Sequence, residues 1–306
     1  MDPGSTPAPA SWLTRADSRA LTTARSVDVP KPDDFGFRFG GVARLYGRAA
    51  LARLRASHVL VAGIGGVGSW AAEALARTGV GRITLVDLDE VCVSNVNRQL
   101  HALQSTLGLA KADVMAGRLR DIQPGISVEA RIEFVTESSL PRLLGTDPAH
   151  HGARPDVVLD AIDSVANKAR MVAACHVAGI PIVVCGGAGG RRDPTAVRIR
   201  DLGRVTHDRL LASLRGRLRR DHGFPRDGRE LGIPCVCSAE TPVFPNVTGE
   251  VCTVRPEAGD GESMRLNCDS GFGSATFVTG TFGFAAAAHA VQLATRACGG
   301  AERQRA

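Results

Sequence analysis

The sequence predicts an α/β fold: a doubly wound, Rossmann-like and mostly parallel sheet with helices on both faces. Short β-branched runs alternate with helical segments along most of the chain, and the first run leads into the glycine-rich stretch 63–68. The chain has 306 residues, of which 44% are hydrophobic and 22% charged. That composition is enough to bury the core of one large domain.

A strand, a glycine turn, a helix and a second strand follow one another near the start of this fold. Residues 58–62 are apolar and β-branched, 69–77 are typical of a helix, and 82–86 form a second apolar run that ends at Asp87. Glycines let a phosphate approach the backbone, and a helix N-terminus offers it free N–H groups. Asp87 is placed to meet a ribose hydroxyl. The stretch predicts a nucleotide site whose turn contains Gly63, Gly65, Gly66 and Gly68.

Residues beyond this motif favour ATP over a dinucleotide cofactor. Residues 94–99, SNVNRQ, add a cation and several amides where NAD needs neither. Arg98 and Lys111 would balance the charge of a triphosphate whose α-phosphate is attacked, and Asp163 would hold its Mg²⁺. A nicotinamide-dependent oxidoreductase stays open as an alternative, although it leaves these three residues without a role. The predicted nucleotide contacts also include Asp89, Ser94, Asn95, Asn97 and Ser164.

The N-terminal part is expected to lie outside the folded domain. Residues 1–34 are rich in Pro, Ser, Thr and Ala and show no hydrophobic period, so we expect a disordered leader. The leader has no apolar signal-peptide segment, and the eight cysteines are irregularly spaced, which favours reduced thiols in the cytoplasm. No C-x-x-C pair occurs, so a structural zinc is not supported. A helical segment is expected over residues 38–55.

The middle of the chain continues the alternation of strands and helices. Asp87, Asp163 and the glycine-rich segment 186–190 each follow a predicted strand. The carboxyl ends of parallel strands share one edge of a sheet, so we expect these three elements at one ligand-binding edge. The further elements expected are a helix over 111–121, a strand over 127–135, a strand over 156–160, a helix over 167–178 and a strand over 181–185.

Arginines crowd into residues 198–220, partly on a helix expected from about residue 207. Two interpretations are open: a solvated helix face, or a surface that binds the phosphates of RNA. The net charge of +6 and the pI of about 9.1 favour a polyanionic partner. The residues proposed to bind RNA are Arg215, Arg217, Arg219 and Arg220.

Two further stretches carry expectations. Residues 232–241, GIPCVCSAET, are expected to form a loop near the site, with Cys235 either a catalytic thiol or an incidental one. Residues 270–295 contain no Asp, Glu, Lys or Arg. We expect a buried helix at a homodimer contact, and membrane association through this stretch is the minority interpretation.

Several motifs carry a resemblance to known families. GIGGVGSWAAEALARTG, VDLDEVCVSNVNRQ, GLAKA and DAIDS resemble the superfamily of the ubiquitin-activating enzymes and their bacterial relatives ThiF and MoeB. RFGGVARLYG, NRQLHAL, GGAGGRRDPT and CDSGFGSATFVTGTFGF resemble, within it, the TcdA (CsdL) family of tRNA threonylcarbamoyladenosine dehydratases. The resemblance runs from about residue 35 to about residue 297, which is nearly the whole chain.

This resemblance implies ATP-dependent adenylation followed by cyclisation of a modified tRNA adenosine in the cytoplasm. It implies one adenylating domain over residues 35–298, with 198–220 as an arginine-rich insert and 299–306 as a polar tail. It also favours RNA as the partner of the arginines, a homodimer, and a cysteine desulfurase system as a possible partner. In the wider superfamily an arginine of the opening segment reaches the partner subunit's ATP site; Arg38 and Arg44 are the candidates here. Activation of a small sulfur-carrier protein is the alternative activity.

Overall fold

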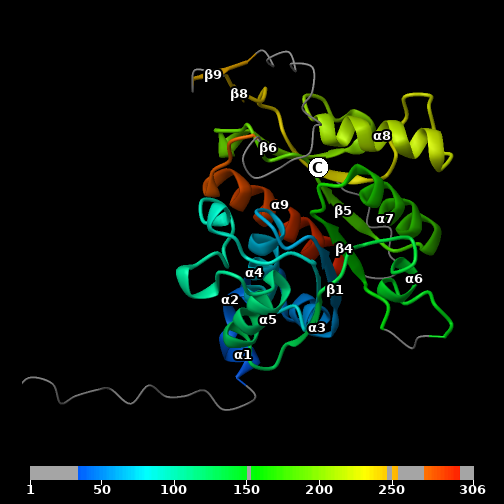
Figure 1. Ribbon diagram of the computed structural model, residues 1–306. Coiled ribbons are helices and arrows are strands. Elements are labelled where there is room, and N and C mark those ends of the chain that lie inside the picture. Colours follow the sequence, from blue (N-terminus) through cyan, green and yellow to red (C-terminus); the bar gives the residue numbers. More distant parts are fainter. Residues whose placement is uncertain (1–33, 150–152, 247–249, 254–271, 297–306) are drawn as a thin grey trace, which may run out of the picture.

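The computed structural model describes residues 34–149, 153–246, 250–253 and 272–296. The expected leader, apart from Asp34, and the expected tail lie outside these residues. At the centre is a seven-stranded sheet in the order β3-β2-β1-β4-β5-β7-β6 (Figure 1). All neighbouring strands are parallel except β6, which pairs antiparallel with β7 at one edge. The predicted fold class is confirmed.

Most strands lie where the apolar runs predicted them. The strands of the main sheet are β1 His58–Ala62, β2 Arg82–Val86, β3 Ser127–Arg131, β4 Val157–Asp160, β5 Ile182–Cys185, β6 Val197–Asp201 and β7 Pro234–Ser238. A separate two-stranded sheet pairs β8 Phe244–Pro245 with β9 Val251–Cys252.

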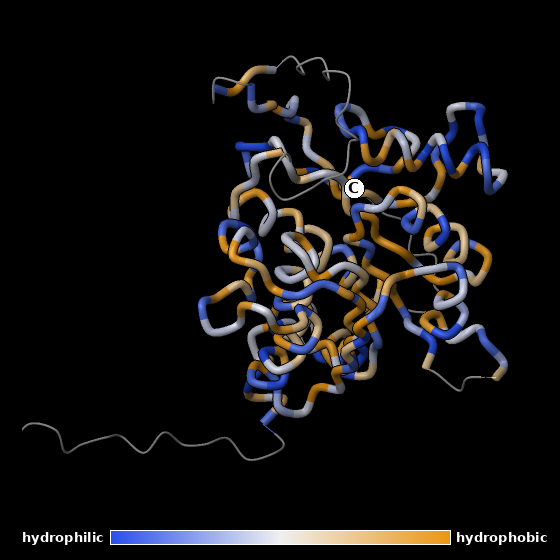
Figure 2. Tube along the Cα trace, viewed as in Figure 1, coloured by the Kyte–Doolittle hydropathy of each residue, from blue (hydrophilic) through white to orange (hydrophobic). Residues whose placement is uncertain are grey.

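Helices cover both faces of the sheet (Figure 1). They are α1 Phe35–Arg38, α2 Gly40–Tyr46, α3 Arg48–Ala56, α4 Gly68–Arg77, α5 Lys111–Ile122, α6 Leu140–Leu143, α7 Val165–Ala178, α8 Arg209–Asp221 and α9 Thr276–Thr295. Successive side chains of a strand point to opposite faces. Val59 and Val61 of β1 therefore join the core under α3, α4, α5 and α9, whereas Leu60 and Ala62 join the core under α6, α7 and α8. Figure 2 shows hydrophobic residues concentrated along these central strands.

Three elements differ from the sequence expectations. The opening helical segment is divided between α2 and α3 because Gly47 adopts a φ of 89°, which ends the first helix. The third strand stops at Arg131, four residues earlier than expected. The prediction of a loop over residues 232–241 is wrong. Strand β7 occupies the centre of this segment and pairs with β5 on one side and with β6 on the other.

The uncharged segment forms α9, which packs against α4 and the sheet. Close packing is possible because Gly283 lacks a side chain: a Cβ there would lie 2.6 Å from the Val67 carbonyl oxygen and 2.7 Å from Trp70 Cβ. Among the described residues, α9 is the one helix long and apolar enough to cross a membrane, but half of its apolar window is buried inside the chain. Phe277 and Phe284 are 57% and 50% exposed, so α9 also presents an apolar surface.

Candidate nucleotide-binding site

The glycine loop between β1 and α4 uses its glycines for two purposes. Gly63 has a φ of 84°, and a Cβ there would lie 2.7 Å from the Ala161 carbonyl oxygen, while one on Gly68 would lie 1.8 Å from that of Gly63. These two glycines are required by the fold of the loop itself. A Cβ on Gly65 would lie 3.9 Å from Gln99 Nε2, its nearest neighbour among the described residues, whereas one on Gly66 would lie 3.3 Å from Arg98 Cγ. The loop is therefore most open at Gly65, where a phosphate can approach the backbone.

Asp87, at the end of β2, is held against this loop by two backbone donors. The Ile64 N–H donates to its Oδ2 at 2.5 Å, and the Asp89 N–H donates to its Oδ1 at 2.8 Å. Burial raises the pKa of Asp87, while both hydrogen bonds and the nearby Lys111 act in the opposite direction. A carboxylate has lone pairs left after these two bonds, so Asp87 can still accept a hydrogen bond from a sugar hydroxyl.

Lys111 begins α5 with its ammonium group already paired. Its Nζ lies 2.8 Å from Asp89 Oδ2, and the lysine side chain is only 7% exposed whereas that of Asp89 is 63% exposed. The Lys111 N–H also donates to the Asp89 carbonyl oxygen at 3.0 Å. The structure thus brings together two predicted site residues that sequence reasoning did not connect. Asp89 therefore balances the charge of the Lys111 ammonium group.

Arg98 lies over the glycine loop. Its Nη1 donates to the Ser94 carbonyl oxygen at 2.7 Å and to Asn97 Oδ1 at 3.0 Å. Its methylenes pack above Gly66, where a Cβ would lie 3.3 Å from Arg98 Cγ. Asn97 donates to the Ser274 carbonyl oxygen just before α9, which holds this segment in place. The predicted site residue Arg98 therefore lies next to the predicted glycine loop.

Asn95 is turned inward instead of towards a ligand. Its side chain is buried, and its Oδ1 accepts the Cys92 N–H at 3.1 Å. The amide shapes the short helical turn Val93–Asn95 that presents Ser94 and Arg98. The structure thus gives Asn95 a local role in supporting the segment.

Asp163 lies in the turn between β4 and α7, two residues beyond the Ala161 that packs on Gly63. Its side chain is exposed, and among the described residues it has no hydrogen-bond or ion-pair partner. Ser164 occupies the N-cap position of α7 and makes no capping hydrogen bond. Both side chains are therefore available to a ligand at the mouth of the loop. The described residues contain no cluster of three or more His, Cys, Asp or Glu suited to hold a metal by themselves.

A buried ion pair supports this turn, and sequence reasoning missed it. Lys168 Nζ lies 2.9 Å from Asp160 Oδ2, and both side chains are fully buried. Lys168 also donates to the Cys185 carbonyl oxygen at 3.1 Å, and Asp160 Oδ1 accepts the Ile162 N–H at 3.0 Å. The pair ties the end of β4 to β5 and α7 and shapes the turn that leads to Asp163.

His101 is a second contact that the sequence did not indicate. Its Nε2 lies 2.7 Å from the Ile64 carbonyl oxygen, inside the glycine loop, and the ring is 1% exposed. Burial lowers the pKa of His101 to about 4, the hydrogen bond to Ile64 opposes this shift, and Lys111 adds to it. The neutral ring therefore donates to the loop as a structural support. No motif or hydrophobic period in the sequence marks His101 as a contact of the glycine loop.

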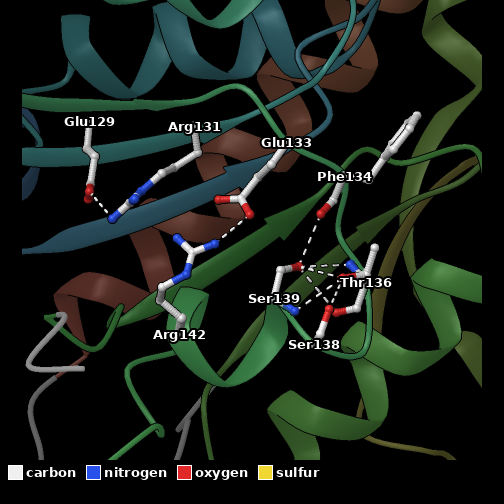
Figure 3. Close-up of polar contacts among 8 residues, drawn as sticks. All are labelled: Glu129, Arg131, Glu133, Phe134, Thr136, Ser138, Ser139 and Arg142. Carbon is white, nitrogen blue, oxygen red and sulfur yellow. Dashed lines mark hydrogen bonds and ion pairs between the residues drawn. The ribbon is translucent and has the colours of Figure 1, made fainter. Parts of the chain in front are cut away.

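A shallow apolar pocket opens beside Asp87, where β2 and β3 end. Leu88, Ile132 and Phe134 are exposed at its rim. Figure 3 shows what holds its floor: Arg142 Nη2 lies 2.6 Å from Glu133 Oε2, and Ser139 Oγ lies 3.1 Å from the Phe134 carbonyl oxygen. Neighbouring contacts join Glu129 to Arg131 and link Thr136, Ser138 and Ser139. The chain that follows β3 is thereby shaped into a pocket wall.

Cys235 does not belong to this group. It lies in β7, fully buried, with its Sγ 3.5 Å from the Ile233 carbonyl oxygen. Burial raises the pKa of its thiol well above the ordinary value, although Lys168 acts in the opposite direction. A buried, protonated thiol in a strand paired on both sides lacks the mobility and thiolate character of a nucleophile. The structure supports the interpretation of Cys235 as a core residue.

The four arginines of α8 proposed to bind RNA already have partners within the chain. Arg215 Nη1 donates to the Leu202 and Val205 carbonyl oxygens, and Arg219 Nε donates to that of Pro225 at 2.9 Å. Arg217 and Arg220 both pair with Asp221, at 3.1 and 2.8 Å. Their binding to RNA stays a prediction. An RNA phosphate would have to compete with these contacts for the guanidinium groups.

Comparison with known proteins identifies the family of the chain. The sequence model of the ThiF family matches residues 41–303. The tRNA threonylcarbamoyladenosine dehydratase of Escherichia coli (strain K12) is 49% identical over 267 residues, which cover 87% of this chain and 96% of that protein. The enzyme of the same name from Haemophilus influenzae is 42% identical, over 85% of this chain and 94% of that protein.

Solved structures of proteins with that dehydratase fold are similar to this chain. One named TcdA (CsdL) superposes with a TM-score of 0.75 at 46% identity, covering 85% of this chain and 94% of that one. The E. coli dehydratase in complex with ATP gives a TM-score of 0.73 at 45% identity, over the same shares. The E. coli molybdopterin-synthase adenylyltransferase is 35% identical over only 42% of this chain and 49% of that protein. The family match, the long alignments and the shared fold lead to one conclusion: the chain belongs to the ThiF family.

Proposed function

We propose that the protein is an ATP-dependent tRNA threonylcarbamoyladenosine dehydratase. The observation that carries the proposal is the convergence of the open glycine loop, Arg98, Lys111 and the unpartnered Asp163 at one sheet edge. It occurs in a chain that aligns over nearly its full length with enzymes of that name.

In the proposed reaction, the threonylcarbamoyl carboxylate of a tRNA adenosine attacks the α-phosphate of ATP. The α–β bridging bond breaks, and pyrophosphate leaves. An atom of the same modification then attacks the acyl-adenylate, closes a ring and expels AMP. The tRNA loses one molecule of water overall. Because a carboxylate is already a nucleophile, the first step chiefly requires positioning and charge neutralisation.

The residues of the site suit these requirements. Arg98, which lies over Gly66, is placed to bind phosphate oxygens above the loop. Lys111 would exchange its contact with Asp89 for a phosphate oxygen of ATP. Asp163 would hold the Mg²⁺ that accompanies ATP and shields its negative charge, since an exposed carboxylate without a partner is a suitable ligand for that ion.

The other end of ATP would extend towards β2 and β3. Asp87, fixed by the Ile64 and Asp89 N–H groups, is oriented to accept a ribose hydroxyl. The shallow pocket next to it has Leu88, Ile132 and Phe134 at its rim, and these apolar side chains offer a surface to the adenine ring. In the proposed pose, the sugar and base would lie on one side of the glycine loop and the phosphates on the other.

We also propose a homodimer, in which the exposed face of α9 lies at the subunit contact. Phe277 and Phe284 are half exposed on a helix without charged side chains, and such a surface requires cover. Arg44 of α2 is exposed and unpaired among the described residues, whereas Arg38 pairs with Asp34 at 2.7 Å. If an arginine of the opening segment serves a partner subunit, Arg44 is the better placed of the two.

The test is to incubate the protein with ATP and tRNA that carries threonylcarbamoyladenosine, then to analyse the digested nucleosides by mass spectrometry. The expected product is lighter than its precursor by one water, and its formation should require ATP. An unchanged nucleoside would contradict the proposal. The matched control is the Asp163→Asn variant, which keeps the size of the side chain and removes its charge.

Adenylation of a sulfur-carrier protein is the second candidate. The partial match to molybdopterin-synthase adenylyltransferase supports the shared nucleotide-binding half. The alignment with the E. coli dehydratase covers 87% of this chain, about twice the share covered by the alignment with the adenylyltransferase. Formation of a carrier adenylate, with no change in the tRNA nucleoside, would favour this candidate.

A further inference from the structure

The edge strand β6 carries arginines that the nucleotide site does not use. Arg198 and Arg200 are exposed, and among the described residues they have no hydrogen-bond or ion-pair partner. Residues i and i+2 of a strand point to the same face. They lie opposite Cys237 and Cys235 of β7, which belong to the core under α7 and α8. The two guanidinium groups therefore project on the α8 side of the sheet.

A third arginine, Arg191, directly follows the glycine-rich segment 186–190. Arg191 is 4% exposed, and its Nη2 donates to the His207 carbonyl oxygen at 2.6 Å. Among the described residues, its buried Nε and Nη1 have no hydrogen-bond partner. Burial and Asp208 raise the pKa of the Cys237 thiol, and Arg200, Arg191 and Arg198 oppose that rise, so all three arginines act on one residue.

Two carboxylates near this group offset part of its charge. Asp208 caps α8 by accepting the Leu211 N–H and also accepts the Gly187 N–H, both at 2.9 Å. Glu240 accepts the backbone N–H groups of residues 192 and 193. Both carboxylates act electrostatically on Arg191, where they oppose the lowering of its pKa by burial, and among the described residues neither forms an ion pair with it. Against three guanidinium groups, the two carboxylates leave one positive charge uncompensated at this partly buried site.

The backbone at this point is also unusual. His207, whose carbonyl oxygen Arg191 binds, has a φ of 57°, the only positive φ of a residue other than glycine in the described part of the chain. A left-handed backbone and an incompletely bonded buried arginine both cost free energy. When such features occur together, they point to a function that the site retains at the expense of stability.

We propose that Arg191, Arg198 and Arg200, here called the β6 arginine strip, form a binding surface for the backbone phosphates of the tRNA substrate. The inference rests on the proposed function. Arg198 and Arg200 would contact the phosphates, and Arg191 would supply a fixed positive charge beneath them. Arginine forks match phosphate oxygens, and the desolvated position of Arg191 strengthens its field.

The location suits a substrate that must also reach ATP. Arg198 lies next to the carboxyl end of β7, at the sheet edge where the glycine loop opens. Four strand intervals separate β1 from β6, about 19 Å at roughly 4.8 Å each. An RNA stem-loop is long enough to span this distance. The modified base would lie at the α-phosphate of ATP, with neighbouring phosphates on the strip.

This assignment differs from the one based on α8. Arg217 and Arg220 share Asp221, so an RNA phosphate would first have to displace a carboxylate. Arg198 and Arg200 need no such exchange. The two pairs are therefore matched for a test, because each consists of two exposed or half-exposed arginines of one element and carries the same charge.

The experiment measures tRNA affinity of the full chain as a function of salt, for wild type, the double variant Arg198→Gln/Arg200→Gln and the control Arg217→Gln/Arg220→Gln. Each lost phosphate contact lowers the log–log salt slope by about 0.7 to 0.9. Two contacts correspond to about 20-fold weaker binding at about 0.15 M salt. The control should change affinity less than about threefold, which is what diffuse charge alone contributes. ATP affinity should stay the same in all three proteins.

Turnover separates this inference from the proposed function. The double variant should raise the KM for tRNA, and Arg191→Gln should weaken tRNA binding in the same direction. Equal losses in the double variant and in the α8 control, or wild-type affinity in the double variant, would overturn the strip while leaving the enzyme assignment intact. A wild-type protein that does not cyclise tRNA at all would overturn both.

Discussion

Replacing Lys168 by Met tests whether the buried ion pair is what holds the turn that leads to Asp163. Lys168 and Asp160 are fully buried with 2.9 Å between Nζ and Oδ2, and the same ammonium donates to the Cys185 carbonyl oxygen. Methionine fills nearly the same volume without charge. The variant therefore leaves the Asp160 carboxylate in the interior without its counter-ion.

The expected cost follows from that uncompensated charge. Removing one partner of a buried pair destabilises a protein by about 3–5 kcal/mol. Burial raises the pKa of Asp160 and Lys168 lowers it, so the variant raises that pKa further. A carboxyl group whose pKa is higher in the folded than in the unfolded state loses stability as the pH rises. The destabilisation by Lys168→Met should thus be larger at pH 8 than at about pH 5.

The free energy of unfolding at each pH is measured by urea denaturation, monitored by far-UV circular dichroism. The double variant Asp160→Asn/Lys168→Met is the matched control, because Asn keeps an oxygen that accepts the Ile162 N–H and removes the buried charge. We expect it to recover at least half of the loss. A single variant within about 1 kcal/mol of wild type, or a double variant no more stable than the single one, would refute the reasoning.

Three further predictions concern the site and its supports. Asp163→Asn should abolish turnover without changing the melting temperature, because its side chain is exposed; normal turnover at saturating Mg-ATP would remove its assigned role. Gly283→Val should destabilise the fold by about 3 kcal/mol in urea, because its Cβ would overlap the Val67 carbonyl oxygen; an unchanged midpoint would contradict the packing of α9. Burial lowers the pKa of His101 to about 4, so the free energy of unfolding of the wild type should fall by about 2 kcal/mol more than that of His101→Gln when the pH is lowered from 7 to 5. An equal fall in the two proteins would contradict a buried neutral ring.

The sequence was sufficient to predict the nucleotide-binding edge because its signals are local. The glycine turn, the acid at the end of β2 and the acid after β4 each lie within a few residues of a recognisable strand. Parallel strand order then brings them to one edge without any further information. The limits of the central strands and of α4, α5 and α7 followed from hydrophobic periodicity for the same reason.

What the sequence did not predict depends on contacts between distant segments. Cys235 lies in a stretch whose Gly and Pro favour a loop, but pairing with two strands overrides that preference. His101 bonds to Ile64, and no pattern of spacing relates the two.

In the proposed reaction, a carboxylate of the tRNA modification attacks the α-phosphate of ATP. An oxygen-isotope experiment follows this step: tRNA whose threonylcarbamoyl carboxylate carries a heavy oxygen isotope is cyclised with ATP, and the released nucleotide is analysed by mass spectrometry. Attack at the α-phosphate predicts pyrophosphate and AMP, with one heavy oxygen on the AMP phosphate after ring closure. Release of ADP, or of AMP without the label, would show that the carboxylate does not attack the α-phosphate.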